Sequence, residues 1–453
     1  MTNLLPANCR AVLPAAVFMV LFSGFFCTVS AQQFIWAPPA LQQLIDEALE
    51  NNRLLQSKAD RAEALKKRIP AAGALPDPKI GFALQSIPTD SFTLDQEPMT
   101  QKQIFVEQTV PWLSKLDLRS EAAAAEARQQ KAELEAARLE LARDVAVAWY
   151  ELGYVVESLR INDELTDLVA RIRRDTESRY AVGDGLQQDI FQAGVELSRL
   201  KDEAVRLENR RTTIEDRLHE LTNRVEPTSI DPPADLSGLG FVISAEKLAA
   251  AALEKNPDLQ GMQAQIQTAR TQKQLAQKDY YPDFNIRLTY GQREEDRTGR
   301  DLPDFVSAAV AMDIPLWHKS KQSNEVAAAS RNQFSAQNRY RDLQNRLPYR
   351  IQSLVAEIND TRRRYRLYTE ELIPQAGQWA RSAKEAYEVD RVEFDTMIDA
   401  RIRVLKYRRE ASRLFHDIYQ KRAELEAWVG GTATGKTLKD NSHAFKGQSY
   451  DQR

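Results

Sequence analysis

Four short segments of the chain alternate between apolar and polar residues, the pattern of a β-strand with one apolar and one polar face. They cover residues 79–87, 101–110, 284–292 and 305–314. In the third segment, for example, Ile286, Leu288 and Tyr290 alternate with Arg287 and Thr289. Each segment is about 9–10 residues long, the length of a tilted membrane strand. The pattern predicts two β-hairpins, either half-buried in a soluble α+β domain or embedded in a membrane.

The loops inside the two predicted hairpins favour the membrane alternative. Residues 88–100 and 293–303 are long and charged, as the outer loops of membrane β-barrels are and tight turns are not. Four strands are too few to close a barrel, yet open strand edges cannot lie in lipid. The barrel would have to be shared, and three copies of the chain would supply twelve strands, an even number within the known range.

The segments between the strands are rich in Ala, Glu, Arg and Leu, which is typical of long coiled-coil helices. One long helix is predicted over 113–182, a length of roughly 100 Å at 1.5 Å per residue. Its counterpart over 317–387 contains Pro348 and Pro374, which are expected to kink or break it. The remaining predicted helices cover residues 41–72, 186–224, 245–278 and 392–429.

The same order of elements occurs twice along the chain. The matched segments are EALENN at 47–52 with AALEKN at 251–256, VPWLSK at 110–115 with IPLWHK at 314–319, and the turns that begin at Tyr180 and Tyr387. Solenoid repeats have periods nearer 20–50 residues, so an offset of 204–207 residues indicates a domain-sized duplication. We predict a first repeat over 32–225, a proline-rich linker over 226–243 and a second repeat over 244–429.

The N-terminal segment, residues 1–31, has the pattern of an export signal. Arg10 precedes an apolar stretch, and small residues stand before a cleavage point after Ala31. A retained anchor is the alternative, but the apolar stretch is shorter than the ~20 residues that span a bilayer. Both cysteines, Cys9 and Cys27, lie in this segment, and lipidation of Cys27 is a further alternative that the bulky residues before it disfavour.

Composition and local motifs narrow the function classes. A mature chain without cysteine would have no disulfide and no Cys-ligated zinc. A net charge of −3 with 28% charged residues does not indicate a nucleic-acid partner. The polar tail, 430–453, begins with GGTATGKT, but a helix rather than a strand leads into this phosphate-loop pattern, so we expect disorder there and no nucleotide site. No arrangement of residues indicates an enzyme, a cofactor or a metal site.

Taken together, the order of elements resembles that of the TolC-like outer-membrane efflux proteins over about residues 40–430. The local features that carry the resemblance are the Pro-Asp pairs before the first strand of each repeat (Pro76-Asp77 and Pro282-Asp283), the prolines after each second strand (Pro111 and Pro315), and Tyr180 and Tyr387 at the turns. The runs at 96–112 and 292–316 further resemble the branch associated with heavy-metal resistance, of the cobalt-zinc-cadmium type.

The resemblance implies a mainly α-helical fold with membrane β-strands: a homotrimer whose twelve-stranded outer-membrane β-barrel continues into a twelve-helix periplasmic tunnel. It implies a passive efflux duct of a Gram-negative bacterium, possessing no enzymatic activity and no cofactor. The implied partners are a periplasmic adaptor (membrane fusion) protein, an inner-membrane resistance-nodulation-division transporter and outer-membrane lipid. Two alternatives stay open, an exit duct for protein secretion and an exported structural coiled-coil protein.

The family closes the periplasmic end of its tunnel with rings of acidic residues. The matching positions are Asp399 and Thr396, where Thr396 departs from the usual aspartate, with Asp395 next to it and Asp189 at the same place in the first repeat. A ring of carboxylates would attract cations and repel anions. The alternative is that these residues are solvated on exposed helix faces.

Two further sets of residues are candidates for contacts outside the chain. The helix-turn tips that would contact the adaptor contain Gly183, Asp184, Gly185, Asp390 and Arg391. Trp112 and Trp317 follow the second strand of each repeat, where they would anchor at the membrane interface or pack at the junction between strands and helices.

Overall fold

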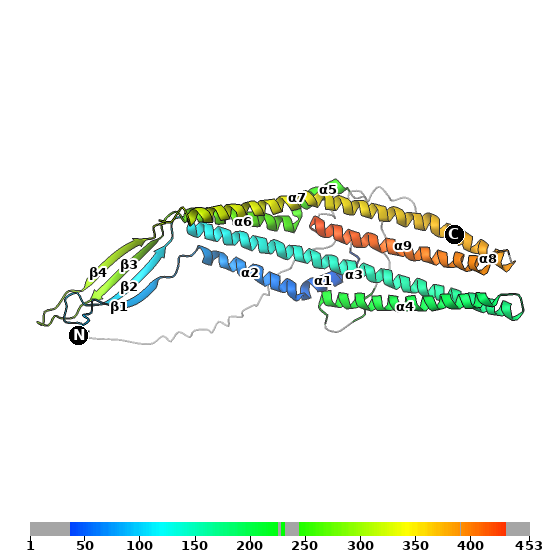
Figure 1. Ribbon diagram of the computed structural model, residues 1–453, viewed down its shortest axis with the longest axis horizontal. Coiled ribbons are helices and arrows are strands. Elements are labelled where there is room, and N and C mark those ends of the chain that lie inside the picture. Colours follow the sequence, from blue (N-terminus) through cyan, green and yellow to red (C-terminus); the bar gives the residue numbers. More distant parts are fainter. Residues whose placement is uncertain (1–36, 225–227, 232–243, 390, 432–453) are drawn as a thin grey trace, which may run out of the picture. The chain divides into compact units, whose positions relative to one another are not determined.

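The computed structural model describes residues 37–224, 228–231, 244–389 and 391–431 (Figure 1). The predicted export signal, most of the predicted linker and the tail from residue 432 onward lie outside these ranges, as does Asp390. The described part of the chain is mainly α-helical and contains one β-sheet.

The sheet has four antiparallel strands in the order β1-β2-β3-β4. Their bounds are Lys79–Gln85 for β1, Gln101–Val110 for β2, Phe284–Gln292 for β3 and Phe305–Met312 for β4. The central pair joins the two halves of the chain, since β2 pairs with β3 and places Val106 opposite Leu288. Among the described residues, β1 and β4 each pair on one side only, so the sheet is open. One chain therefore does not close a barrel.

The two faces of the sheet differ in chemistry. One face carries apolar side chains across all four strands, and these are exposed: Phe82 is 64% and Val310 is 67% accessible. The opposite face carries polar pairs between strands, including an ion pair of Glu107 with Arg287 and a hydrogen bond that the Thr109 hydroxyl donates to Asn285 at 2.7 Å. Because adjacent residues of a strand point to opposite faces, the alternation in the sequence separates these two surfaces.

The helices follow the duplication. In the first repeat, α1 covers Pro39–Asn51, α2 Arg53–Gly73, α3 Lys115–Ala181 and α4 Gln187–Thr222. In the second, α5 covers Ala245–Lys255, α6 Pro257–Lys278, α7 Gln322–Arg366, a π-helix Leu367–Leu372, α8 Ile373–Glu388 and α9 Phe394–Val429. Among the described residues, no helix combines the length and the apolar composition needed to cross a membrane.

The first helix of each repeat is divided in two, where the sequence pattern predicted one continuous helix. The divisions lie at Asn52 and Asn256, whose side chains accept hydrogen bonds from the N–H groups of Leu55 at 3.0 Å and Leu259 at 3.1 Å. Asparagine offers the backbone this local bond in place of a helical one, which makes it a favoured N-cap. Pro257 follows the second cap at the first position of the helix, where proline is tolerated.

The second long helix differs from the first along its length. It begins at Gln322 rather than at the predicted residue 317, and α7 continues through Pro348. The interruption is the π-helix that ends just before Pro374 enters the first turn of α8. Tyr180 follows Lys115 by 65 residues, whereas Tyr387 follows Lys319 by 68. A π-helix accommodates extra residues in a helix of the same span, which gives a physical reason for the interruption.

Helices lie side by side in the same order as the strands. α3 contacts α2 and α6, and α6 contacts α7; nearer the turns, α3 contacts α4 and α9, and α9 contacts α8. In the described part of the chain, β1, α2 and α4 thus form one edge of the subunit, and β4, α7 and α8 form the other. The shorter α1 packs on α3 and α4, and α5 packs on α7 and α9.

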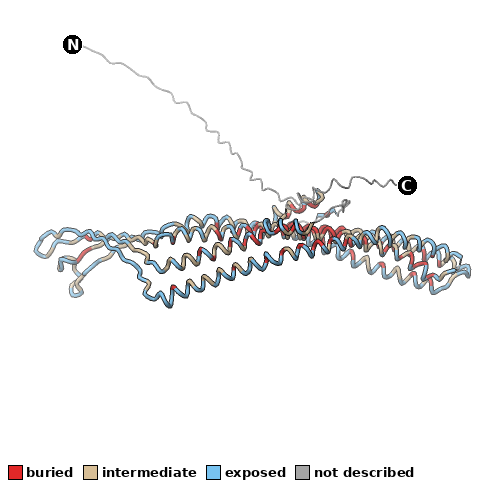
Figure 2. Tube along the Cα trace, turned by 90° about the horizontal axis from the view of Figure 1, so that it is seen from above, coloured by how far each residue is buried: buried red, intermediate tan, exposed pale blue. Residues whose placement is uncertain are grey.

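The buried core lies in the helices, whereas the strands are mostly exposed (Figure 2). One cluster joins α1, α3 and α4 around Ile45 and Leu218, and a second joins α5, α7 and α9 around Leu248 and Ile351. The third cluster, which includes Ile398, joins α3 and α4 to α9 near the turns. Each fully buried aliphatic side chain contributes about 1.5–3 kcal/mol, so these clusters hold the helices in place.

Candidate functional site

The turn between α3 and α4 is shaped by its two glycines. Gly183 has a φ of +84°, in the left-handed region that side chains disfavour. At Gly185, an added Cβ would lie 3.1 Å from the backbone nitrogen of Tyr180. The Asp184 N–H donates to the Arg179 carbonyl at 2.9 Å, which closes the turn. Two apolar side chains of this tip, Val182 and Leu186, are exposed.

The turn between α8 and α9 is built without glycine. The Arg391 N–H donates to the Ala386 carbonyl at 2.8 Å, and the Thr396 N–H donates to the Glu393 carbonyl at 3.1 Å. Arg391 is exposed, and Asp390, the other predicted tip residue here, lies outside the described residues. The second tip is therefore held by ordinary backbone bonds.

Arg179 connects the two tips. Its guanidinium lies 4.8 Å from the ring centre of Tyr387 and donates to the Tyr387 carbonyl at 3.4 Å. On its own side it lies 3.7 Å from the carboxylate of Asp184. Cation–π contacts and hydrogen bonds from charged donors are among the stronger polar interactions of a protein. Arg179 therefore joins the first repeat to the second at the end of the helices that carries the two turns.

Asp189 and Asp395 lie close together at the base of the tips. Asp189 is only 7% exposed, and its burial, together with the negative charge of Asp395, raises its pKa above the ordinary value. Arg179 acts in the opposite direction and lowers the pKa of Asp189, whereas the negative charge of Glu393 raises it. Gln192 donates a hydrogen bond to the Asp395 carboxylate from the neighbouring helix α4. The structure thus brings together two of the four predicted constriction residues.

The other two predicted constriction residues, Thr396 and Asp399, are exposed on α9. Asp399 lies four residues after Asp395, one helical turn further from the tip. At the offset of 207 residues, Thr396 corresponds to Asp189, and Asp399 corresponds to Gln192. Equivalent positions of the two repeats therefore carry different chemistry. Asp189 is acidic and buried where Thr396 is neutral and exposed, and Gln192 is neutral where Asp399 is acidic, both being exposed.

The sequence interpretation missed three residues of this site. Gln192 could have been found by aligning the repeats, because it occupies the place of Asp399. Arg179 directly precedes Tyr180, the residue that marks the first turn, but nothing local indicates that it reaches Tyr387. Glu393 contributes only through its charge near Asp189.

The two tryptophans after the strands have different surroundings. Trp112 stacks on Tyr281, with ring centres 5.0 Å apart, and on Phe284 at 6.0 Å. Trp317 is 68% exposed. Trp112 thus packs at the junction between strands and helices, whereas Trp317 presents its ring outward, beside the equally exposed Leu316.

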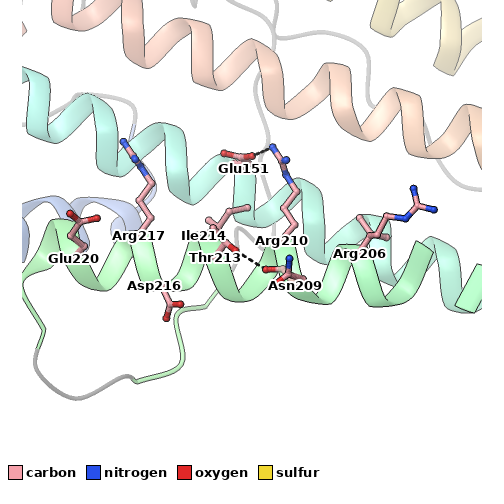
Figure 3. Close-up of a pocket in the computed structure, with 10 residues that line it drawn as sticks. Glu151, Arg206, Asn209, Arg210, Thr213, Ile214, Asp216, Arg217 and Glu220 are labelled. Carbon is pink, nitrogen blue, oxygen red and sulfur yellow. Dashed lines mark hydrogen bonds and ion pairs between the residues drawn. The ribbon is translucent and has the colours of Figure 1, made fainter. Parts of the chain in front are cut away.

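A groove of about 740 Å³ lies between α3 and α4 (Figure 3). Figure 3 shows Arg210 directed toward Glu151, with which it forms an ion pair. Arg206, another lining residue, is paired with Asp202. The charges of these two arginines are thus already matched, and the lining residues combine no nucleophile with a general base. We assign no reaction to this groove.

Comparisons with known proteins identify the family. The model of the family described as outer membrane efflux protein matches residues 44–224 and 248–431, one segment in each half of the chain. A search of curated proteins found no match.

Solved structures share the fold. VceC from Vibrio cholerae has a TM-score of 0.75 and 19% sequence identity, over 89% of this chain and 99% of that chain. The outer membrane channel CmeC from Campylobacter jejuni has a TM-score of 0.72 and 15% identity, over 88% of each chain. The open state of the MtrE outer membrane channel from Neisseria gonorrhoeae has a TM-score of 0.71 and 16% identity, over 87% of this chain and 90% of that chain. Since the family model covers both repeats and most of the chain, the protein belongs to the outer membrane efflux protein family and is an efflux channel of the outer membrane.

Proposed function

We propose that three copies of the chain assemble into one channel, with a twelve-stranded barrel in the outer membrane and a twelve-helix tunnel in the periplasm. The observation that carries this proposal is that the sheet and the helices are open at the same two edges. An unpaired strand edge cannot lie in lipid, because its backbone groups would have no hydrogen-bond partner. Pairing β4 of each copy with β1 of the next would give the backbone groups of every edge strand a hydrogen-bond partner.

The two faces of the sheet fit the inside and outside of such a barrel. The apolar face, which includes Phe82 and Val310, would contact lipid, and the face with the Glu107–Arg287 pair would line a wet lumen. Trp317, together with Leu316, would lie at the periplasmic membrane interface. Trp112 takes the packing role at the junction instead.

We assign the constriction to the region where Asp189 and Asp395 meet, with Thr396 and Asp399 on the adjoining face of α9. Three subunits would place these carboxylates in rings, which attract cations and repel anions. The tips, which include Gly183–Gly185 and Arg391, would contact a periplasmic adaptor through the exposed Val182 and Leu186. An inner-membrane transporter of the resistance-nodulation-division type would deliver the substrate.

The proposed cargo is a heavy-metal cation. The acidic constriction supports this choice, together with the resemblance of the runs at 96–112 and 292–316 to the metal-resistance branch. The chain itself would be a passive duct, because transport is powered by the inner-membrane partner.

Deleting the gene and testing growth on zinc, copper, cobalt, cadmium and a panel of drugs examines the cargo. We expect sensitivity to one or more metals, restored by the intact gene. Sensitivity to drugs alone would contradict the metal assignment, and loss of a secreted protein without any sensitivity would favour a secretion duct.

Cell fractionation tests the assembly. Heat-modifiable trimers in the outer membrane are expected, whereas soluble fibres would contradict the channel itself.

A further inference from the structure

The contact between the two repeats contains a buried ion pair at the junction between strands and helices. The side chain of Lys115 is only 5% exposed and lies 2.9 Å from a carboxylate oxygen of Asp283 and 3.1 Å from one of Asp279. The backbone N–H of Trp112 donates to the same oxygen of Asp283 at 2.8 Å. Lys115 begins α3 in the first repeat, and Asp283 precedes β3 in the second. This cluster therefore fixes one repeat against the other.

The duplication provides a second copy of both partners. VPWLSK aligns with IPLWHK, so Lys319 is the counterpart of Lys115, and the two Pro-Asp pairs align Asp77 with Asp283. Both Asp77 and Lys319 are exposed, and in the described part of the chain neither forms an ion pair. They also lie at opposite edges of the subunit, since Asp77 precedes β1 and Lys319 follows β4.

We infer that Lys319 forms an ion pair with Asp77 of the partner subunit. The contact between two subunits would then have the same arrangement as the contact between the two repeats within one subunit. This inference rests on the proposed trimer and adds which residues of neighbouring subunits lie opposite one another. The strand preceding Lys115 pairs with the strand following Asp283, and the trimer would bring together β4 and β1 of neighbouring copies in the same relation. The position equivalent to Asp279 is Gly73, so the pair between subunits has one carboxylate where the internal cluster has two.

The same equivalence sets the register of the strands between subunits. Val106 pairs with Leu288 inside the chain, and these positions correspond to Val310 and Phe82. Val310 is thus placed opposite Phe82 of the partner subunit. Both side chains belong to the exposed apolar face, so this register continues the apolar face from one copy to the next. A shift by one residue would turn apolar side chains into the lumen, which is why register is strongly specified.

Disulfide trapping tests the register. Phe82→Cys combined with Val310→Cys is expected to give a ladder of linked dimers and trimers on non-reducing gels of outer membranes. The matched control pairs Phe82→Cys with Ala311→Cys, whose side chain lies on the opposite face, and the parent chain controls for Cys9 and Cys27. Linking in the control but not in the test pair would overturn the register. Intact heat-modifiable trimers without any link in the test pair would also overturn the register, while leaving the proposed channel in place. Absence of trimers from the parent protein would instead contradict the channel.

Charge reversal tests the ion pair. Asp77→Lys and Lys319→Asp are each expected to lower the trimer fraction about tenfold on dilution in detergent, as removal of a buried interfacial charge partner does. The double variant is expected to recover most of that loss, because the pair is restored with its signs exchanged. The matched internal control, Asp283→Lys with Lys115→Asp, alters a contact within one subunit. Unchanged trimer fractions in the single variants, or losses without recovery in the double variant, would overturn the ion pair.

Discussion

The helix hairpins that end the two repeats are equivalent in sequence position and different in how they are held. α3 is continuous from Lys115 to Ala181, whereas its counterpart is interrupted by the π-helix Leu367–Leu372. The first turn depends on Gly183 at a positive φ, and none of the described residues of the second turn has a positive φ. Asp189 is buried and Thr396, its counterpart, is exposed. The first hairpin is thus shaped by its own backbone.

The second hairpin depends more on contacts with the first. Arg179 reaches across to Tyr387, and Gln192 reaches across to Asp395. Both contacts originate in the first repeat and end in the second. We take the arrangement of the tips in this structure as the closed state of the proposed channel. This arrangement should be sensitive to a few side chains of the first hairpin, and variants can separate the two hairpins experimentally.

The largest effect is expected from Arg179→Ala. The change removes the bond to the Tyr387 carbonyl and the cation–π contact with its ring. Hydrogen bonds to charged groups are worth about 1.5–3 kcal/mol, so the population of open tips should rise roughly 10- to 100-fold. Single-channel recordings in planar bilayers measure this as open probability. Arg174→Ala, an exposed arginine of the same helix, should behave as the parent, and an unchanged open probability in Arg179→Ala would show that the tips close without it.

A smaller effect is expected from Asp399→Asn. Asp399 is exposed on α9, and its counterpart in the first hairpin is the neutral Gln192, so this carboxylate is a contribution of the second hairpin alone. Removing one negative charge per subunit should raise the concentration of a di- or trivalent cation that blocks the channel several-fold. Conductance titrations with the cation provide the measurement. Asp60→Asn on α2 is the charge-matched control, and an unaltered block in Asp399→Asn would remove this residue from the constriction.

Gly183→Ala and Arg391→Ala compare the two turns directly. A side chain in the left-handed conformation of Gly183 costs about 1–2 kcal/mol, so amide exchange in the first turn should accelerate roughly tenfold. Arg391 is exposed and its backbone bond survives truncation, so Arg391→Ala should change exchange in the second turn little. Hydrogen-exchange mass spectrometry of both turns distinguishes the cases. Equal acceleration in both variants would mean that glycine geometry does not set the first turn.

The comparison also shows how far the sequence predicts the fold. The predicted ranges of β2 and β3 coincide with those of the structure, because strict alternation has a period of two and ends where prolines and charged loops begin. The divisions at Asn52 and Asn256 were not predicted, since the apolar period continues across both caps. The π-helix likewise has no local signal in the sequence beyond the three additional residues between Lys319 and Tyr387.

The candidate site was less predictable than the fold. The acidic positions could be assigned because the repeats align around Tyr180 and Tyr387. The contact of Arg179 with Tyr387 joins residues 208 positions apart, and only the packing of α3 against α9 and of α9 against α8 brings them together. Sequence periodicity reports which face of a helix is apolar, and it carries no information on which polar side chain of that helix meets which neighbour.

The smallest and most specific effect concerns the pH dependence of the tips. Burial and the charge of Asp395 raise the pKa of Asp189, so the closed arrangement favours the protonated carboxyl. An acid whose pKa is raised in the closed state destabilises that state once it ionises. Closure should therefore strengthen as pH falls through the raised pKa toward the ordinary aspartate value, and weaken as pH rises. Asp189→Asn removes the titrating group, and its open probability should vary less with pH over that interval.

Open probability recorded against pH in planar bilayers compares the parent, Asp189→Asn and Thr396→Asp. The last variant places a carboxylate at the equivalent but exposed position of the second hairpin, where water solvates its charge and little additional pH dependence is expected. The charges of Asp395 and Glu393 both raise the pKa of Asp189, so Asp395→Asn alone should weaken the pH dependence of the parent without removing it. A parent channel that opens on acidification, or an Asp189→Asn channel with the parental profile, would mean that burial at this position does not couple to closure. A flat profile in Asp189→Asn with a parental profile in Thr396→Asp would locate the pH response in the first hairpin, the one whose own backbone sets its shape.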